Sequence, residues 1–154
     1  MNNSYQEYLN FSHKLADAAS ETSMQYFRTS LDIDNKSDDS PVTIADKNTE
    51  LKIRSLIEKE YPNHGILGEE FDSSNPDADF VWVIDPIDGT RSYIAGHKDF
   101  GNLISLTHNK KPIIGIINCP AHDERWVGNK NQNSTLNGKP AKSSKVTNIE
   151  DAYL

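Results

Sequence analysis

Closely spaced carboxylates are the residues of this sequence whose types and spacing could do chemistry. Glu69 and Glu70 end one short apolar stretch, and Asp85 and Asp88 lie three residues apart in a turn that follows another. Clustered carboxylates repel one another unless a cation lies between them, and ligand sets made only of oxygen favour Mg²⁺, Mn²⁺ or Ca²⁺ over softer metals. The sequence therefore predicts a divalent-metal site, with Mg²⁺ as the first choice.

The turn that contains the two aspartates could also hold an anion. Pro86 fixes its own φ angle, and Gly89 allows close approach of the backbone. The backbone N–H groups of Gly89 and Thr90, at the expected start of a helical turn, could bind a phosphate oxygen. Asp-Pro and Asp-Gly are also ordinary turn formers, so this segment alone is equally consistent with a turn that binds nothing. The sequence contains neither a P-loop nor a nucleophile elbow.

Composition and charge exclude several classes of function. The chain has 154 residues, 35% of them apolar, which is typical of one globular domain. Its formal net charge of −7 disfavours nucleic acid as a partner. No run approaches the roughly 20 apolar residues that span a bilayer, so no membrane partner is expected. The single cysteine, Cys119, excludes an intrachain disulfide, and the expected location is a reducing cytoplasm.

Hydrophobic spacing predicts the elements that must position these carboxylates. Apolar residues at three- and four-residue steps predict a helix over residues 5–28 and a second helix that begins near Thr43 or Asp46 and ends by Tyr61. Shorter apolar runs predict strands at residues 31–36, 65–68, 80–84, 103–107, 112–118 and 125–128. Asn137 and Gly138 predict a hairpin turn. Two helices followed by a run of strands indicate an α+β fold with an antiparallel meander.

Three motifs, in this order, resemble the inositol monophosphatase superfamily of Mg²⁺-dependent, lithium-sensitive phosphomonoesterases. They are the segment from Pro41 to Asp46, the Gly-Glu-Glu segment at 68–70, and the Trp-x-x-Asp-Pro-Ile-Asp-Gly-Thr segment at 82–90. Residues 91–96 and 115–128 are most similar to the histidinol-phosphatase branch. The resemblance implies the N-terminal half of a layered αβαβα sugar-phosphatase fold, with two helices packed on a mainly antiparallel sheet and the C-terminal half absent.

The resemblance also implies which residues bind metal. Glu69 and Asp85, together with the backbone carbonyl of Ile87, match the ligands of a first Mg²⁺ ion. Asp85 would bridge to a second ion that Asp88 also binds. Members of the superfamily hold two or three Mg²⁺ ions, and the second site here lacks an aspartate that they supply from a C-terminal W-D-x-A-A-like motif.

The catalytic assignment rests on the same resemblance. Thr90, paired with Asp46 and helped by Glu69, would orient and deprotonate a metal-bound water, which is the nucleophile. The N–H groups of Gly89 and Thr90 would hold the phosphate. No phosphoenzyme is needed for this reaction.

These assignments lead to one expected function and two alternatives. Residues 1–145 are predicted to form a metal-binding N-terminal phosphatase domain, and residues 146–154 the start of a truncated C-terminal α/β domain. The expected activity is hydrolysis of a small phosphorylated metabolite. Histidinol phosphate is the first choice of substrate, and its hydrolysis is a step of histidine biosynthesis. The chain is also expected to form a homodimer through an open sheet edge. The alternatives are an inositol-1-monophosphatase-type enzyme and a non-catalytic module that binds metal and phosphate.

Overall fold

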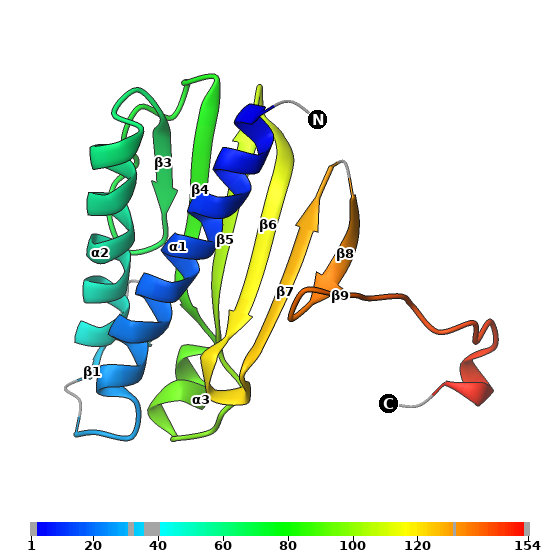
Figure 1. Cartoon of the computed structure of the whole chain (residues 1–154). Coiled ribbons are helices and arrows are strands. Elements are labelled where there is room, and N and C mark those ends of the chain that lie inside the picture. Colours follow the sequence, from blue (N-terminus) through cyan, green and yellow to red (C-terminus); the bar gives the residue numbers. More distant parts are fainter. Residues whose placement is uncertain (1–2, 31–32, 36–40, 131, 153–154) are drawn as a thin grey trace.

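The computed structural model describes residues 3–30, 33–35, 41–130 and 132–152. Figure 1 shows two long helices lying side by side on one face of a twisted sheet, and a short third helix at the lower end of the sheet. The helices are α1 (Asn3–Tyr26), α2 (Ile44–Glu60) and α3 (Thr90–Ile94). The expected pair of helices on a sheet is therefore confirmed.

The sheet has seven strands, which neighbour one another in the order of the chain. They are β3 (Gly65–Gly68), β4 (Phe80–Asp88), β5 (Gly101–His108), β6 (Lys111–Cys119), β7 (Glu124–Asn129), β8 (Gln132–Leu136) and β9 (Lys139–Pro140). Only β3 and β4 are parallel, and the other five neighbouring pairs are antiparallel. The prediction of a mainly antiparallel sheet is confirmed. Two further strands, β1 (Ile33–Asn35) and β2 (Pro41–Thr43), form a separate antiparallel pair.

Helix α2 begins at one of the two positions predicted from the sequence. The side chain of Thr43 accepts a hydrogen bond from the backbone N–H of Ala45 at 3.1 Å, and the Asp46 carboxylate accepts one from the N–H of Thr43 at 2.8 Å. This reciprocal arrangement is a capping box, which satisfies N–H groups that the first helical turn leaves without partners. Of the two predicted starts, Thr43 is therefore the N-cap, and Asp46 lies in the first turn.

Three strands of the sheet, β4, β8 and β9, differ from the prediction. Strand β4 does not end at Ile84 but continues to Asp88, with a shift of register after Asp85. The polar strands β8 and β9 were not predicted. The turn between them was predicted, and Asn137 and Gly138 take the positive φ angles of 48° and 76° that such a hairpin needs. Most of the loop predicted between residues 35 and 41 lies outside the described residues.

The C-terminal segment lies apart from the sheet. Figure 1 shows the chain leaving β9 as an extended segment that ends in a short helical turn. This turn is η2 (Ile149–Asp151), a 3-10 helix, and residues 153 and 154 lie outside the described part of the chain. The domain boundary at residue 145 remains a prediction.

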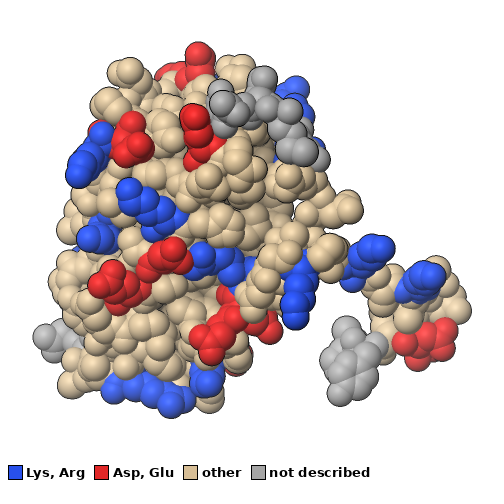
Figure 2. All heavy atoms as spheres, viewed as in Figure 1, with Lys and Arg blue, Asp and Glu red and all other residues tan. Residues whose placement is uncertain are grey.

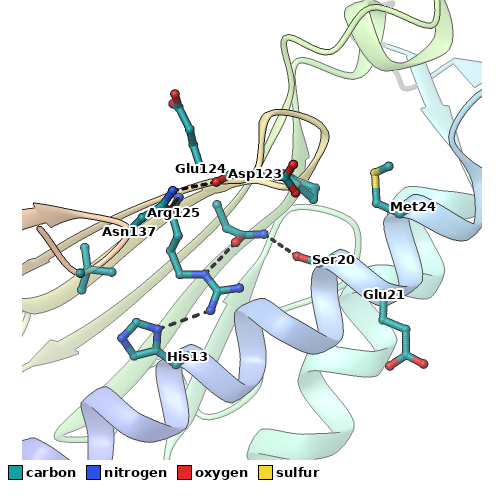
Figure 3. Close-up of a pocket in the computed structure, with 12 residues that line it drawn as sticks. His13, Ser20, Glu21, Met24, Asp123, Glu124, Arg125 and Asn137 are labelled. Carbon is teal, nitrogen blue, oxygen red and sulfur yellow. Dashed lines mark hydrogen bonds between the residues drawn. The ribbon is translucent and has the colours of Figure 1, made fainter.

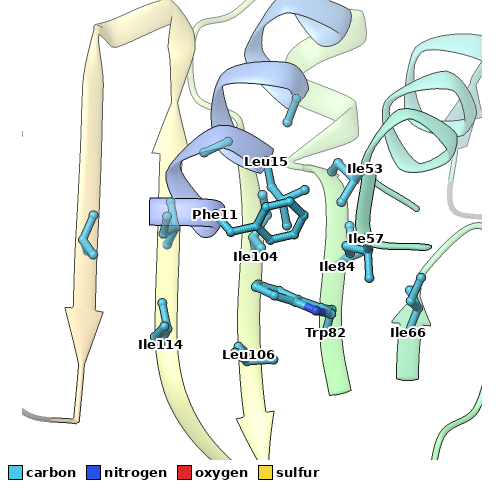
Figure 4. Packing of buried hydrophobic residues seen from close by; sticks show 14 of the residues in the cluster. Phe11, Leu15, Ile53, Ile57, Ile66, Trp82, Ile84, Ile104, Leu106 and Ile114 are labelled. Atoms are coloured by element: carbon cyan, nitrogen blue, oxygen red, sulfur yellow. The ribbon is translucent and has the colours of Figure 1, made fainter. Parts of the chain in front are cut away.

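The core lies between the two long helices and the middle of the sheet. Figure 4 shows Phe11 and Leu15 of α1 over Trp82 of β4 and Ile104 of β5, with Ile53 of α2 beside them. Trp82 and Leu15 are fully buried, as is Ile53. Removal of this apolar surface from water is the main force that holds the helices on the sheet.

The opposite face of the sheet is apolar and open. Val83, Ile117 and Trp126 project from it with exposed fractions of 39%, 51% and 38%. A shallow cavity of about 590 Å³ lies on this face, and Asp85 is among its lining residues. The outer edge of β3 is partly covered, because Ile66 exchanges two backbone hydrogen bonds with Ser74. The homodimer through an open sheet edge stays a prediction, and the sheet face is a second exposed apolar surface.

Charge is distributed on the helical side without a large basic area. Figure 2 shows acidic and basic side chains interspersed over the face that carries α1 and α2. Among the described residues, no helix combines the length and the apolar character that crossing a membrane requires.

Candidate metal and phosphate site

The parallel pairing of β3 and β4 brings the two acidic segments together. Gly68 pairs with Ile84, so the next residues along the two strands are Glu69, just beyond the end of β3, and Asp85, within β4. Parallel strands present their carboxyl ends at the same edge of a sheet, which is where such folds commonly bind ligands. The predicted proximity of these segments is therefore a consequence of the strand register.

Asp85 supplies the most distinctive acceptor of this edge. The side chain is partly buried and has other interactions, but its Oδ1 atom is buried and accepts no hydrogen bond from the residues that the structure describes. Burying a carboxylate oxygen without a donor is unfavourable, and a cation would compensate it. An oxygen of this kind fits the hard cation that the carboxylates predict.

Thr90 joins the aspartate of helix α2 to residues 85–90, which comprise the end of β4 and the start of α3 and are called the metal turn below after their predicted role. Its hydroxyl lies 3.4 Å from Oδ1 of Asp46 and 3.0 Å from the backbone carbonyl oxygen of Ile87, and it can donate to either acceptor. Oδ2 of Asp46 is already engaged, because it accepts from the N–H and the hydroxyl of Thr43 at 2.8 and 2.7 Å. The capping box thus fixes Asp46 with Oδ1 directed to Thr90, as the resemblance implied.

Position 89 requires a glycine because of its backbone conformation and its close neighbours. Its φ angle is 84°, and a Cβ atom there would lie 2.8 Å from the carbonyl oxygen of Asp99. Helix α3 begins at the next residue, so the N–H groups of Gly89 and Thr90 lie at its start. The phosphate-binding role of these two N–H groups stays a prediction.

The predicted ligands are not all gathered into one group. Within the described ranges, no three side chains of His, Cys, Asp or Glu lie close enough together to hold a metal ion. Glu69 and Asp88 are exposed, Asp85 is partly buried, and the carbonyl of Ile87 belongs to a fully buried residue. The structure therefore places these groups along one edge, without the convergence of carboxylates that the resemblance implied.

A buried ion pair behind Glu69 was missed by sequence reasoning. Glu50 is fully buried; its Oε1 accepts from Nε of Arg54 at 2.7 Å, and its Oε2 accepts from the N–H of Glu70 at 2.8 Å. Arg54 also donates to the carbonyl of Phe71 at 3.0 Å. These contacts attach the segment after β3 to helix α2. A Glu and an Arg four residues apart resemble a surface pair in sequence, so their burial gave no signal.

The single cysteine lies near the site without the properties of a nucleophile. Burial, followed by the carboxylates of Glu124 and Asp88, raises the pKa of the Cys119 thiol. The thiol is therefore protonated near neutral pH, and a protonated thiol is a poor nucleophile.

Comparison with known proteins identifies the family. The sequence model of the inositol monophosphatase family matches residues 4–154. This chain belongs to that family. The family member "bifunctional phosphatase IMPL2, chloroplastic" of Arabidopsis thaliana is 44% identical over 142 residues, which are 91% of this chain and 41% of that protein. A histidinol-phosphatase of Chlorobaculum parvum is 40% identical over 134 residues, 86% of this chain and 52% of that protein.

Solved structures agree with this assignment. An inositol monophosphatase from Zymomonas mobilis has 43% sequence identity and a TM-score of 0.81, with 95% of this chain and 56% of that chain covered. The fold is therefore the predicted sugar-phosphatase fold. The chain spans about half the length of the family members that it matches.

Proposed function

We propose that this chain forms the metal-binding and phosphate-binding part of a Mg²⁺-dependent phosphomonoesterase. The observation that carries the proposal is the position of Thr90, whose hydroxyl lies between Asp46 and the carbonyl of Ile87 in the turn that also contains Asp85. This arrangement joins motifs that are 44 residues apart in sequence at one edge of the sheet.

The chain's own oxygen atoms would hold the metal. Glu69, Asp85 and the carbonyl of Ile87 would bind a first Mg²⁺ ion, and Asp85 and Asp88 would bind a second. When bound, Mg²⁺ lowers the pKa of a coordinated water and offsets negative charge on the phosphoryl group. The side chains of Glu69 and Asp88 are exposed and would have to turn toward Asp85 on binding.

Thr90 and Asp46 would handle the proton of the attacking water. When the Thr90 hydroxyl donates to Oδ1 of Asp46, its own lone pairs are free to accept a hydrogen bond from water. The water would thus be oriented toward phosphorus, with Glu69 assisting its deprotonation. The N–H groups of Gly89 and Thr90 would bind the phosphate oxygens, which places the phosphoryl group beside the nucleophile.

Histidinol phosphate is the substrate we favour. The support is the similarity of residues 91–96 and 115–128 to the histidinol-phosphatase branch and the 40% identity to the Chlorobaculum parvum enzyme. The 43% identity to the Zymomonas mobilis inositol monophosphatase supports an inositol phosphate as the alternative. A non-catalytic module that binds metal and phosphate is the third possibility, supported by the incomplete convergence of carboxylates.

We also propose the setting in which this site works. Residues 1–145 form the metal-binding domain, and residues 146–154 begin a second α/β unit. The apolar sheet face favours a homodimer, and the unpaired Cys119 favours a reducing compartment such as the cytoplasm.

Phosphate release tests the proposal. The chain is assayed with histidinol phosphate and with inositol 1-phosphate, with and without Mg²⁺, beside the variants Asp85→Asn and Asp77→Asn. Asp85→Asn should lower Mg²⁺-dependent release by at least about 100-fold, because it removes a charge that holds the metal. Asp77, a surface residue with 90% side-chain exposure, is the control and should leave release unchanged.

Each outcome separates two of the candidate functions. Preference for one substrate decides between the two phosphatase types. Release that survives Asp85→Asn would contradict the metal assignment. Calorimetric Mg²⁺ binding with no release from either substrate would favour the non-catalytic module.

A further inference from the structure

Strands β4 and β5 lose their regular pairing within the metal turn. Asp85 pairs with Leu103 and Asp88 pairs with Gly101, so Pro86 and Ile87 together oppose the single residue Asn102. Such a bulge leaves backbone groups outside the ladder and redirects the side chains next to it. The carbonyl of Pro86 needs another donor here, because Pro86 is buried.

The side chain of Asn102 supplies that donor. Its Nδ2 atom donates to the carbonyl oxygen of Pro86 at 2.7 Å and also lies 3.4 Å from the hydroxyl of Ser23. Asn102 is fully buried, so water does not compete for this bond. The bond fixes the peptide plane between the two residues that follow Asp85, and with it the direction of the turn.

Two further side chains determine which way the Asn102 amide faces. Asn118 of β6, 3% exposed, donates through Nδ2 to Oδ1 of Asn102 at 2.9 Å. Arg125 of β7 donates through Nε to Oδ1 of Asn118 at 2.8 Å. An arginine side chain has donors and no acceptor, so it can face only the oxygen of Asn118. Each amide is therefore fixed by the next, from Arg125 to Pro86.

The outer end of this chain of hydrogen bonds is at the surface. Arg125 also donates to Asp17 of α1 at 2.7 Å and lies 3.4 Å from His13. Figure 3 shows its guanidinium between helix α1 and the sheet, where a cavity of about 580 Å³ opens beside it. Substitution of Arg125 should therefore be tolerated better than substitution of the buried amides.

We infer that Asn102, held in orientation by Asn118 and Arg125, is a positioning residue for the metal turn. None of these three residues belongs to the proposed site, and they act on it through the carbonyl of Pro86. The inference rests on the proposed function for its consequence, metal binding, but the ordering of the turn can be measured in the metal-free chain. Interactions that orient metal ligands are typically worth about 10- to 100-fold in metal affinity.

The test uses two variants and a control in the full chain. Asn102→Asp replaces the donor to Pro86 with an oxygen of the same shape. Arg125→Met removes the donors at the partly exposed outer end and keeps the network testable if Asn102→Asp does not fold. The control is Thr107→Val, because Thr107 also donates from a β5 side chain to a β4 carbonyl, that of Val81 at 3.1 Å, but at the other end of the strands.

The first measurement is amide hydrogen exchange by NMR over residues 87–93 without metal. We expect Arg125→Met to speed exchange there roughly fivefold, the equivalent of about one hydrogen bond, although residue 125 lies three strands away from β4. Thr107→Val should leave these rates within about twofold. Unchanged exchange over residues 87–93 in Arg125→Met would overturn the inference, because a purely structural role would affect only β6, β7 and α1.

The second measurement is the calorimetric affinity for Mg²⁺. We expect a loss of about tenfold for Asn102→Asp and a smaller loss for Arg125→Met, with no change for Thr107→Val. If the unmodified chain binds no Mg²⁺, the proposed function fails, while the exchange rates still decide the positioning role. Equal losses of Mg²⁺ affinity in all three variants would mean general destabilisation and would also overturn the inference.

Discussion

At the scale of single residues, Asp46 has two tasks that depend on its two oxygens. Oδ2 closes the capping box of α2 with Thr43, and Oδ1 faces the hydroxyl of Thr90. In the proposed mechanism, Asp46 would need no further ordering when a substrate arrives, because the capping box already holds its carboxylate in place. A carboxylate that a helix start already orients is thus available for proton handling at low entropic cost.

Removing the Thr90 hydroxyl should affect activity far more than stability. Thr90→Val keeps the shape of the side chain but removes the group that orients the water. We expect phosphate release to fall by about 100-fold or more. Loss of the hydrogen bond to Ile87 should cost about 1 kcal/mol of unfolding free energy, measured by denaturant titration. Thr90→Ser should restore most of the activity, and full turnover in Thr90→Val would contradict the assigned role.

At the scale of elements, the close approach of β3 to α2 depends on one glycine. A Cβ atom at Gly68 would overlap the carboxylate of Glu50, which holds the N–H of Glu70. We expect Gly68→Ala to lower the unfolding free energy by about 1–3 kcal/mol, because the buried ion pair with Arg54 must shift. Thermal unfolding measures this loss. The control is Gly115→Ala in β6, where a Cβ atom meets nothing within 4 Å and no comparable loss is expected.

The aromatic cluster beside β4 should give the fold a pH dependence. Nε1 of Trp82 donates to Nδ1 of His64 at 3.1 Å, so that nitrogen must be unprotonated, and burial lowers the pKa of His64. The folded state therefore takes up this proton less readily than the unfolded state. Stability from this group is complete above the unfolded pKa of about 6.5 and falls as the pH drops below it.

The variant His64→Gln tests this dependence, since glutamine can accept the bond without titrating. Unfolding by denaturant is followed between pH 7.5 and pH 5. The unmodified chain should lose stability over this range more steeply than His64→Gln. The exposed His97 serves as the control, and His97→Gln should keep the steeper slope. Identical slopes in all three proteins would contradict the prediction.

Elements defined by local patterns were predictable, and those defined by distant partners were not. The spacing of apolar residues predicted α2 close to its true limits, and a short apolar run predicted β3 at its true limits. Strand β4 continues past Pro86, whose carbonyl accepts a hydrogen bond from the side chain of Asn102, and no local pattern reveals this partner. Strand β8 consists largely of polar residues, and it forms by antiparallel pairing with β7.

The candidate site shows the same division. Motif resemblance predicted that Thr90 and Asp46 meet, and the structure brings them within 3.4 Å. It did not predict Glu50, because nothing in the sequence shows that this acid is buried. Asn102 and Asn118 were missed for a similar reason, since asparagine in a sequence usually indicates a turn. Polar residues that position a site are recognised by their partners, and these partners come from distant strands.

At the scale of the whole molecule, the open apolar face should control association. Leu103, Ile117 and Trp126 lie in one row across β5, β6 and β7, because each pairs with the next. We expect the chain to self-associate as concentration rises, by burial of this face against a second copy. Ile117→Lys should shift the population to monomer in sedimentation velocity.

The control for this prediction lies outside the sheet. Ile149, 75% exposed, belongs to the C-terminal turn, and Ile149→Lys adds the same charge without touching the row. It should leave the association of the chain unchanged. If the two variants sediment alike, the sheet face is not the surface through which copies meet.

The position of α1 also bears on how the chain acquires its structure. This helix is synthesised before the sheet, yet it packs against β5 and β6, and the hydroxyl of Ser20 accepts a hydrogen bond from Asn118 across 98 residues of sequence. Contacts so distant along the chain form slowly, since a long loop must close before they contribute. On the ribosome, the apolar side of α1 has no sheet to cover until β6 has emerged. The nascent chain therefore exposes the apolar side of this helix to chaperones until β6 has emerged.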